Sequence, residues 1–403
     1  MKVFIMAGGK GTRIAGLNKE IPKPMLSIAG KPILEWQIEC LNKQGYNDIT
    51  IIIGYLGHVI KDYLKDTVKY IEETEPLGTA GAMFMLKGLI EDDFLLINGD
   101  VIFDIDIKRF YAAHKNNPAI ATIFTHPNDH PYDSGIVISN KDGMVLDWLT
   151  KEDERGYYKN KVNAGLHIFS KEILKFFEEP VKKDLDRDIL KKMIPDGTLY
   201  AYDSPEYVKD VGTPERFYEV EKDIISGTVF AKNLSNKQKA VFIDRDGTIN
   251  ESAGFLRDIN DFRLIDGVAD AIKNINRSGY LAIVITNQPV VARGEITCRE
   301  LEYIHNKMET LLGEQGAYLD DIFICPHHPD KGFEGEVLKY KTECNCRKPK
   351  PGMLFSAADK YNIDMSVSYM IGDKQTDKQA GESAGCKKYY KSLNDFSREV
   401  LCK

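Results

Sequence analysis

Short apolar runs alternate with longer segments of helical spacing from the start of the chain. Residues 3–7 and 49–53 are apolar runs of strand length, whereas segments 32–43 and 57–65 place apolar residues three or four positions apart. Strands that alternate with helices are typical of α/β folds, because the helices cover the sheet that the strands build. The first part of the chain is therefore expected to be α/β.

The same alternation continues to about residue 225. The pattern predicts further strands at 94–98, 119–125, 135–139 and 163–169, and further helices at 80–89 and 214–225. These strands extend the expected sheet and make it mixed. The polar segment 226–239, which is rich in Gly, Ser, Asn and Lys, suits a linker.

A second alternation begins after this segment. An apolar strand is expected at 240–243, a helix at 268–278, and apolar strands at 281–285 and 367–371. Polar groups follow each strand: Asp244, the pair Thr286-Asn287, and Asp373 after Gly372. Open parallel sheets bind their ligands at the carboxyl ends of the strands, so these groups are expected to share one site.

The two alternations predict two α/β domains. The first is expected to span residues 1–230 around a mixed sheet, and the second residues 239–403 around a parallel sheet, with 231–238 as the linker. A chain of 403 residues is long enough for two domains, each with its own core.

Charge and hydrophobicity exclude several classes of protein. The net charge of −7, from 54 basic and 61 acidic residues, removes most of the electrostatic basis for binding nucleic acid. No apolar run approaches the ~20 residues that are needed to cross a bilayer. The apolar run at the start of the chain is shorter than the apolar region of a signal peptide. We therefore expect a cytoplasmic protein that begins at Met1 and has no membrane partner.

A glycine-rich turn follows the first strand. Gly8, Gly9 and Gly11 allow the backbone to turn sharply and to expose amide donors, and Arg13 adds positive charge. The spacing matches neither a Walker A loop nor the GxGxxG fingerprint, so a simple tight turn remains an alternative. Lys23 lies between two prolines, which hold its backbone extended; a solvated loop lysine is the alternative here.

Five separated motifs together resemble the sugar-1-phosphate nucleotidyltransferase family. They are MAGGKGTR at 6–13, PKPM at 22–25, EPLGTAG at 75–81, NGD at 98–100 and NAG at 163–165. The resemblance covers about residues 1–230 and implies a Rossmann-like domain. In that reaction an oxygen of the sugar 1-phosphate attacks the α-phosphorus of a nucleoside triphosphate, and pyrophosphate leaves.

The resemblance also implies roles for individual residues of the first domain. Asp100 and Asp210 would hold Mg²⁺, and the glycine-rich turn would bind the phosphates together with Arg13 and Lys23. The remaining substrate contacts implied are Gly78 and Thr79 at the base, Asn163 and Gly165 at the sugar, and Lys151 at the sugar phosphate. Thr150 stands where relatives often have a glutamate, so sugar-hydroxyl contacts inferred from relatives do not transfer.

Two carboxylates, Asp244 and Asp246, follow the strand that opens the second domain. One can attack phosphorus while the other handles protons, although such pairs also cap helices. With Thr286, Lys348, Asp373 and Asp377 they resemble the haloacid-dehalogenase-type phosphatases over about residues 239–390. The resemblance implies that Asp244 forms an aspartyl-phosphate, that Asp246 acts as acid and base, and that Thr286 and Lys348 neutralise the phosphate. Mg²⁺ would bind Asp244, the Asp246 carbonyl and Asp373.

Three cysteines and a histidine form two close pairs in the second domain. Cys325 and His327 precede a polar loop at 329–343, and Cys344 and Cys346 follow it. Four such ligands complete a tetrahedral zinc site with no open position, which indicates a structural role. Unliganded buried cysteines are the alternative.

The second domain most closely resembles one subfamily, the D,D-heptose 1,7-bisphosphate 7-phosphatases. The segments that carry this likeness are DRDGTIN at 244–250, TNQ at 286–288, ARG at 292–294, CPHHP at 325–329 and CRKPKPGM at 346–353. Asn287 and Arg293 are thereby expected to contact substrate. Histidinol-phosphate phosphatases share the zinc loop and are the nearest rival, and Pro289 stands where relatives commonly have serine.

The two resemblances predict consecutive reactions. Removal of the 7-phosphate from heptose 1,7-bisphosphate leaves heptose 1-phosphate, which the first domain would convert to a nucleotide heptose. Transfer of GMP from GTP is expected from the likeness to the guanylyltransferase branch; ATP, CTP and UTP stay open. Mannose or another hexose 1-phosphate as acceptor, and a degenerate regulatory role for one domain, are the alternatives. A homo-oligomer is also left open.

Overall fold

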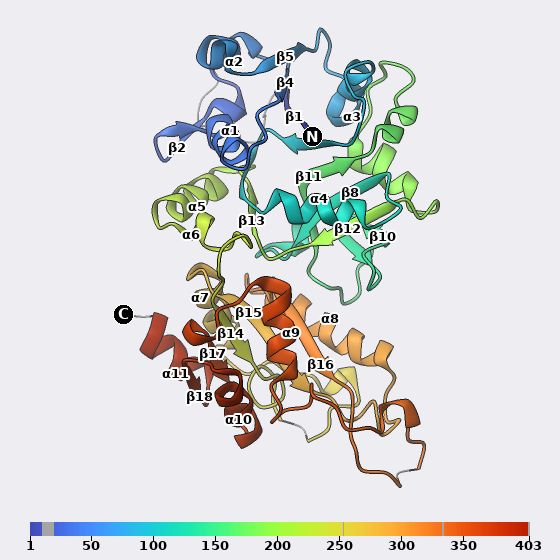
Figure 1. The fold of residues 1–403 in the computed structure, drawn as a ribbon, viewed down its shortest axis with the longest axis vertical. Coiled ribbons are helices and arrows are strands. Elements are labelled where there is room, and N and C mark those ends of the chain that lie inside the picture. Colours follow the sequence, from blue (N-terminus) through green and yellow to red (C-terminus); the bar gives the residue numbers. More distant parts are fainter. Residues whose placement is uncertain (10–19, 253, 333, 402–403) are drawn as a thin grey trace. The chain divides into compact units, whose positions relative to one another are not determined.

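The computed structural model describes residues 1–9, 20–252, 254–332 and 334–401. The chain divides into two compact units (Figure 1). The first unit comprises residues 1–126, 137–149 and 163–230. The second comprises residues 231–403 together with 127–136 and 150–162.

The first unit is built on a mixed sheet with the order β10-β9-β11-β6-β1-β4-β5, and β8 joins β11 to β12. Its strands are β1 (Lys2–Ala7), β4 (Ile49–Ile53), β5 (Lys69–Glu72), β6 (Phe94–Asn98), β8 (Ala121–His126), β9 (Ile136–Ser139), β10 (Val145–Leu149), β11 (Val162–Phe169) and β12 (Leu199–Asp203). The strands β6, β1, β4 and β5 are parallel, whereas β11 runs antiparallel to β6. The expected mixed α/β sheet is confirmed.

Alternate residues of these strands enter cores on opposite faces of the sheet. On one face, Ile5, Ile51 and Ile97 pack with apolar residues of α1, α2 and α4. On the other, Phe4 and Leu96 pack with residues of shorter helical segments, including η4 and η7. Strand side chains alternate between faces, so a sheet covered on both sides needs the nearly continuous apolar runs that the sequence has. The helices of this unit are α1 (Ile33–Lys43), α2 (Gly57–Leu64), α3 (Gly78–Gly81), α4 (Ile107–Lys115), α5 (Pro214–Ile225), η2 (Lys23–Met25), η4 (Ala82–Leu86), η6 (Lys171–Phe176) and η7 (Leu185–Leu190).

The prediction of a single helix at 80–89 is wrong in detail. The segment instead forms the short α3 followed by the 3₁₀ helix η4. Gly78 enters α3 with φ +76°, and a Cβ on Gly81 would lie 2.8 Å from the carbonyl oxygen of Val181. This close approach of a distant segment overrides the local helical pattern.

The second unit contains a wholly parallel sheet with the order β16-β15-β14-β17-β18. Its strands are β14 (Ala240–Ile243), β15 (Leu281–Asn287), β16 (Asp321–Cys325), β17 (Tyr369–Ile371) and β18 (Lys388–Tyr390). Its helices are α7 (Val268–Arg277), α8 (Cys298–Glu314), α9 (Gly352–Tyr361), α10 (Gln375–Ala384) and α11 (Leu393–Phe396). The predicted parallel α/β sheet is confirmed here.

Helices cover both faces of this second sheet. Val241, Ile243 and Val284 pack with α7, α8 and α11, and Phe242 and Ile283 pack with α9 and α10. Because β14 and β15 are buried on both faces, their ends are fixed within a rigid core. Side chains that follow these strands are therefore held in place.

The segment 231–238, expected as a linker, is packed into the second unit. Leu234 belongs to its core, and Gln238 is buried. The Lys232 ammonium is also buried and lies 3.2 Å from the Asp320 carboxylate. A polar composition alone did not reveal these contacts, because each partner lies far away in the sequence.

Candidate active sites

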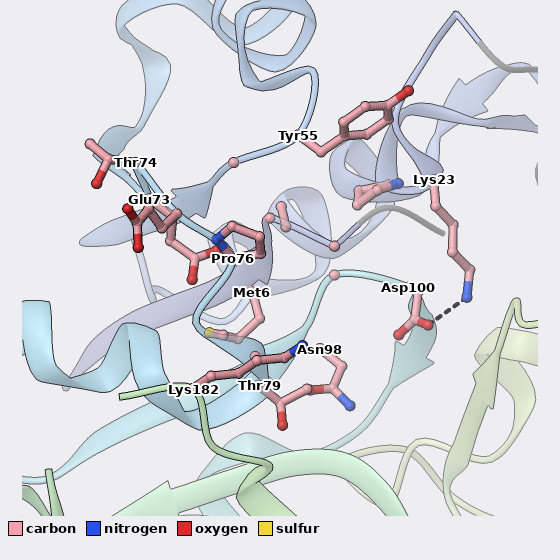
Figure 2. A pocket seen from close by; sticks show the side chains of 18 of the residues that line it. Met6, Lys23, Tyr55, Glu73, Thr74, Pro76, Thr79, Asn98, Asp100 and Lys182 are labelled. Carbon is pink, nitrogen blue, oxygen red and sulfur yellow. Dashed lines mark hydrogen bonds and ion pairs between the residues drawn. The ribbon is translucent and has the colours of Figure 1, made fainter. Parts of the chain in front are cut away.

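The first unit contains a cavity of about 940 Å³ at the carboxyl ends of β1, β4, β5 and β6 (Figure 2). The lining residues are Met6, Ala7, Gly8, Gly9, Lys23, Pro24, Gly54, Tyr55, Glu73, Thr74, Glu75, Pro76, Gly78, Thr79, Asn98, Gly99, Asp100, Lys182 and Gly212. Four of the five motifs of the first domain thus contribute to one cavity. This position is where open α/β sheets bind ligands.

Neighbouring strand ends approach one another closely at the cavity floor. The amide of Gly99 donates to the Met6 carbonyl at 2.9 Å. A Cβ on Gly8 would lie 2.2 Å from Oε2 of Glu73. A side chain at Gly8 would therefore displace the Glu73 carboxylate, and the strand of Gly8 leads directly into the turn that the sequence assigns to phosphate. Gly11 and Arg13 lie outside the described residues.

Lys23 and Asp100 face each other across the cavity opening as an ion pair of 2.5 Å (Figure 2). The lysine side chain is 9% exposed and the carboxylate 31%. Pro22 precedes Lys23 in extended conformation, with φ −68° and ψ 150°. The prolines thus fix the lysine backbone, and the half-buried carboxylate keeps an accessible edge.

Asp210 lies on the strand that pairs with the segment after Asp100. The strand β13 (Tyr207–Asp210) runs antiparallel to β7 (Val101–Asp104), and the amide of Val211 donates to the Asp100 carbonyl at 2.8 Å. Arg216 donates to both carboxylate oxygens of Asp210, at 2.9 and 3.0 Å. The structure therefore brings the two expected metal acids to adjacent backbone positions, each beside a cation.

The expected sugar residues are placed less completely. Gly165 has φ +75°, and a Cβ there would lie 2.6 Å from the Asn98 side chain. Asn163 accepts from the Gly165 amide and donates to Asp186, both at 3.2 Å. Neither residue is among the described residues that line the cavity. Lys151 belongs to a segment of the second unit and is not brought to the cavity lining either.

Glu73 is a cavity residue that the sequence reasoning missed. Burial raises the pKa of this carboxyl, although a backbone hydrogen bond from Leu77 partly opposes that shift. One oxygen, Oε1, is buried without a hydrogen-bond partner among the described residues. A buried oxygen without a donor is costly unless a ligand supplies one. The only signal in the sequence is an acid two positions before the EPLGTAG motif.

In the second unit, three neighbouring parallel strands end at one group of polar residues. Asp244 follows β14, Thr286 lies near the end of β15, and Asp373 follows β17; β14 lies between the other two strands. The expected convergence at the carboxyl edge of the sheet is observed. Oxygens of Asp244, Asp373 and Asp377 lie within 4.8 Å of one another, which suits a hard cation.

Backbone geometry allows this approach. Gly247 has φ +85°, and a Cβ there would lie 2.5 Å from a carboxylate oxygen of Asp373. A side chain at Gly247 would therefore both strain the turn and displace the acid. Asp377, which stands in α10, joins the cluster although the sequence analysis assigned it no role. Burial raises its pKa, and the charge of Lys348 opposes that shift.

Lys348 is buried between two acids. Its Nζ lies 2.7 Å from Asp244 and 2.6 Å from Asp377, and donates to the carbonyl of Ile285 at 2.7 Å. Asn287 holds its backbone by accepting from the Lys348 amide and donating to the Lys348 carbonyl. A buried ammonium so fixed beside Asp244 can stabilise negative charge that develops there.

Asp246 is held by its own neighbour in the chain. The Arg245 guanidinium donates to both Asp246 oxygens, at 2.6 and 2.7 Å, and Gln288 and Asn250 donate to the same carboxylate. Burial opposes ionisation of Asp246, but these donors outweigh it and lower the pKa. In the chain without substrate, the carboxylate is thus charged and tightly oriented.

Arg293 lies next to the polar loop 329–343. Its guanidinium stacks 4.2 Å from the centre of the Phe255 ring, and the neighbouring Ala292 carbonyl accepts from the Val337 amide at 3.0 Å. Burial lowers the pKa of His328, and the positive charges of Arg347, Arg293 and Lys341 lower it further. These cationic side chains therefore lie close enough to act on one imidazole.

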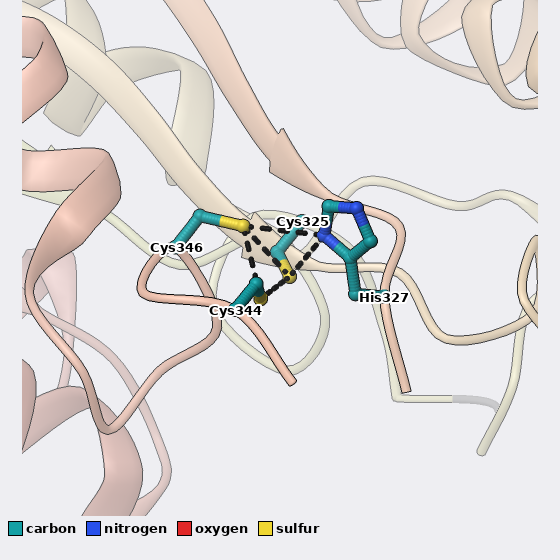
Figure 3. A group of neighbouring side chains, drawn as sticks. All are labelled: Cys325, His327, Cys344 and Cys346. Atoms are coloured by element: carbon teal, nitrogen blue, oxygen red, sulfur yellow. Dashed lines mark hydrogen bonds between the residues drawn. The ribbon is translucent and has the colours of Figure 1, made fainter. Parts of the chain in front are cut away.

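The four expected zinc ligands converge in space (Figure 3). The three sulfur atoms of Cys325, Cys344 and Cys346 are 3.2 to 3.5 Å apart. Nδ1 of His327 lies 3.4 Å from the Cys346 sulfur and 3.7 Å from that of Cys325. Ligand atoms about 2.3 Å from a tetrahedral ion are separated by about 3.7 Å, so this donor set fits a closed metal site. His328 points elsewhere and accepts from the Asp330 amide.

Among the helices formed by the described residues, none is both long and apolar enough to cross a membrane.

Comparisons with known proteins distinguish the two parts of the chain. Residues 2–227 match the nucleotidyl transferase family, and residues 345–390 match the HAD-hydrolase-like family. D-glycero-beta-D-manno-heptose-1,7-bisphosphate 7-phosphatase of Salmonella typhi is 45% identical over 151 residues, which are 38% of this chain and 78% of that protein. The enzyme of the same name from Escherichia coli K12 is also 45% identical, over 77% of its length and 38% of this chain.

A solved structure of HddC from Yersinia pseudotuberculosis is 30% identical and covers 55% of this chain and 99% of its own, with a TM-score of 0.49. The family match over residues 2–227 takes in more than half of the chain. The phosphatase relatives share most of their length with it. The chain therefore belongs to the nucleotidyl transferase family in its N-terminal part and, in its C-terminal part, to the HAD-like family of these 7-phosphatases.

Proposed function

We propose that this chain is a bifunctional enzyme of nucleotide-heptose synthesis. Its second unit removes the 7-phosphate of D-glycero-D-manno-heptose 1,7-bisphosphate, and its first unit transfers GMP from GTP to the resulting heptose 1-phosphate. The observation that carries this proposal is a separate charged site in each of two units, whose families catalyse compatible reactions. Both substrates are small molecules, and the enzyme works in the cytoplasm, where nucleoside triphosphates are available.

The phosphatase step uses the Asp244 carboxylate as nucleophile. Its oxygen forms a bond to phosphorus while the bond to the sugar oxygen breaks, and Asp246, which must carry a proton in the substrate complex, gives that proton to the sugar oxygen. Asp246 then takes a proton from the water that attacks the aspartyl-phosphate, so that phosphate leaves and Asp244 is restored. Lys348 neutralises charge on the transferred phosphoryl group, since its ammonium is fixed 2.7 Å from Asp244. Thr286, at the end of the adjacent strand, binds the same group.

Mg²⁺ in this site would be held by Asp244, Asp373 and the carbonyl of Asp246. The convergence of carboxylate oxygens within 4.8 Å supports this assignment. Bound there, the ion supplies charge neutralisation for phosphoryl transfer. In the other unit, Asp100 and Asp210 would hold Mg²⁺, which fits the oxygen character of both acids and their adjacent backbone positions.

A substrate with a second phosphate accounts for the cations near the loop 329–343. Arg293, Lys341 and Arg347 all lower the pKa of His328, whereas Asp330 raises it. Glu336 lies 3.3 Å from Lys341 and Glu295 lies 4.0 Å from Arg293, so these acids offset part of the positive charge. Cationic clusters bind phosphate through charge-assisted hydrogen bonds. The cluster thus favours a bisphosphate over a monophosphate such as histidinol phosphate, the substrate class of the rival family.

The transferase step needs alignment and charge more than covalent chemistry. An oxygen of heptose 1-phosphate attacks the α-phosphorus of GTP, and the bond to pyrophosphate breaks. Lys23 and the glycine-rich turn bind the triphosphate, whereas Asn163 and Gly165 bind the sugar. Gly78 and Thr79 line the base site.

Glu73 supports the choice of guanine. Guanine presents two neighbouring N–H donors, at N1 and N2, and a carboxylate offers two acceptor oxygens. Oε1 of Glu73 is buried without a donor among the described residues, and the carboxylate already accepts a hydrogen bond from the Leu77 backbone. A guanine N–H would satisfy Oε1 once the side chain turns toward the cavity. Adenine, cytosine and uracil do not offer this pair of adjacent ring and exocyclic N–H groups.

The cysteine and histidine cluster would hold a structural Zn²⁺. Its three sulfurs and one nitrogen leave no open coordination position for substrate or water. The ion would connect the two ends of the loop 329–343, which carries part of the cationic cluster.

One experiment tests the whole proposal. The purified chain is supplied with heptose 1,7-bisphosphate, heptose 1-phosphate, mannose 1-phosphate or histidinol phosphate, each with one of the four nucleoside triphosphates, and phosphate and pyrophosphate are measured separately. Heptose bisphosphate with GTP should release both products, and heptose 1-phosphate with GTP only pyrophosphate. Preferred turnover of mannose 1-phosphate or histidinol phosphate would overturn the substrate assignment. A unit without any activity would instead be a regulatory module.

A further inference from the structure

His305 is a buried titratable residue for which neither reaction provides a role. It stands on α8 and is 7% exposed. Burial and the nearby Arg245 lower its pKa to about 3, so the imidazole is neutral. Its Nε2 lies 3.2 Å from Nη1 of Arg245. Because a guanidinium can only donate, Nε2 accepts this hydrogen bond.

Arg245 is fully buried and links His305 to Asp246. Its Nη1 donates to His305, whereas its Nη2 and Nε donate to Asp246. Nη2 also donates to Oε1 of Gln288 at 3.1 Å, and Nε2 of the same Gln288 donates to Asp246 at 2.9 Å. The guanidinium is planar and rigid, so acceptors on its different edges fix its orientation together.

The contacts leave Asp246 little freedom. Both of its oxygens accept hydrogen bonds from the protein, and its side chain is only 15% exposed. His305 holds the guanidinium edge that points away from Asp246. Loss of that acceptor would leave a buried N–H unpaired, and the guanidinium would turn to find another partner. Any rotation of the Arg245 guanidinium also moves the Asp246 carboxylate to which it is hydrogen-bonded.

We propose that His305 is a positioning residue for phosphate-ester hydrolysis, which acts through Arg245 to aim the carboxyl group of Asp246 at the leaving oxygen of the substrate. This inference rests on the proposed role of Asp246 as acid and base. Arg245, Gln288 and His305 form a clamp, and this clamp orients the proton donor Asp246. The nucleophile Asp244 is held by Lys348 and not by a side chain of the clamp, whereas Gln288 of the clamp also donates to Thr286 at 2.9 Å.

The effect of the clamp on the reaction rate should be larger for a substrate whose leaving group needs a proton. When the ester bond of a sugar phosphate breaks, the alkoxide is a poor leaving group and takes the proton from Asp246. The p-nitrophenolate ion is stable at neutral pH and leaves without one. General acid catalysis typically contributes 10²- to 10⁴-fold, and in the step that releases the leaving group this factor applies only to the first substrate. The later attack of water, in which Asp246 acts as base, is common to both substrates.

The experiment compares the single-turnover rate at which the leaving group is released from heptose 1,7-bisphosphate with the same rate for p-nitrophenyl phosphate in the full chain, because this rate does not include the later attack of water. His305→Phe keeps an aromatic ring of similar size but removes the acceptor. His305→Gln restores an acceptor through its side-chain carbonyl. Met308→Leu, a buried change one turn along α8, controls for altered packing of the helix. Nucleotidyl transfer by the other unit verifies the amount of intact protein.

His305→Phe should lower the release rate for the sugar phosphate about 10-fold or more while changing the release rate for p-nitrophenyl phosphate less than about 2-fold. His305→Gln should recover most of the loss, and Met308→Leu should leave the ratio of the two release rates unchanged. Equal losses on both substrates in His305→Phe would mean a purely structural role and overturn the inference. Asp246→Asn separates the two proposals: if it changes the ratio and His305→Phe does not, only the clamp is wrong. If Asp246→Asn leaves the ratio unchanged, its proposed role as acid is itself wrong.

Discussion

Glu73 gives the first cavity a recognition group that differs from the cations around the phosphates. It is a half-buried carboxylate at the end of β5, packed against Gly8 and Gly54. A carboxylate in this position repels phosphate but accepts N–H donors, so it is suited to a base. Selectivity for guanine should therefore depend on one side chain.

Replacement of Glu73 by Gln should reduce kcat/KM for GTP roughly 10- to 100-fold, because a hydrogen bond to a charged group is exchanged for one to an amide that also presents a donor. Activity with ATP should change little. Glu75→Gln, which alters another acid lining the cavity, is the matched control. Steady-state kinetics with both triphosphates measure the effect. An equal loss with GTP and ATP would show that Glu73 only supports the fold.

His167 should make the stability of the first unit depend on pH. It lies in β11, fully buried against Phe169, and neither ring nitrogen has a hydrogen-bond partner among the described residues. Burial lowers its pKa from 6.5 to about 3. A proton therefore binds the unfolded chain more readily, so stability is fully present above pH 6.5 and is lost as pH falls toward 3.

Denaturant unfolding at pH 7 and pH 4 tests this point. Both tryptophans, Trp36 and Trp148, belong to the first unit, so tryptophan fluorescence reports on that unit alone. His167→Leu should lose less stability than the wild type between the two pH values, by on the order of 1–3 kcal/mol. The same loss in both proteins would contradict a neutral buried histidine.

At the scale of elements, strand ends determine where chemistry takes place. The zinc-type cluster connects the end of β16 to the segment before α9, and between them lies the loop 329–343. That loop has little secondary structure, apart from the single turn η10 (Leu338–Tyr340). Its order should therefore come from the metal rather than from backbone pairing.

Cys344→Ala should remove about one zinc per chain, lower the melting temperature of the second unit, and raise KM for heptose bisphosphate about tenfold. The loop carries Lys341, part of the cationic cluster, so its loss of order weakens recognition of the second phosphate. Cys386→Ala, a cysteine outside the cluster, is the control. Elemental analysis measures the zinc content of each variant, and steady-state kinetics measure KM for heptose bisphosphate. Metal-free protein with full activity would mean that the cysteines are only packed thiols.

Elements with strong local patterns were predictable from the sequence. The strand Phe94–Asn98 and the helix Pro214–Ile225 have the expected bounds, because their apolar spacing and their ends are encoded locally. The helix expected at 80–89 is broken by a distant carbonyl, and the expected linker is packed through Lys232 and Leu234. Long-range contacts of this kind leave no periodic signal.

The same distinction holds for the sites. Asp244, Asp373 and the zinc-type ligands stand in motifs, so their convergence was expected and is observed. Glu73 and His305 act through burial and through partners far away in the sequence, and neither belongs to a motif. Burial and unpaired polar atoms are visible only in the folded chain.

At the scale of the whole molecule, the two units should perform consecutive reactions that can be separated chemically. The phosphatase product is the transferase substrate, so pyrophosphate release from heptose bisphosphate and GTP requires Asp244, although Asp244 belongs to the other unit. The requirement should disappear when heptose 1-phosphate is supplied directly. This conditional dependence distinguishes a reaction sequence from two unrelated activities.

Asp244→Asn should reduce phosphate release about a thousandfold or more, because the amide is a far weaker nucleophile than the carboxylate. With heptose bisphosphate and GTP, pyrophosphate release should fall equally, and addition of heptose 1-phosphate should restore it to the wild-type rate. Asp266→Asn, an exposed acid of the same unit, should change neither product. Pyrophosphate formed by Asp244→Asn from the bisphosphate would show that the transferase accepts the 7-phosphorylated sugar, and the order of the two reactions would then be reversed.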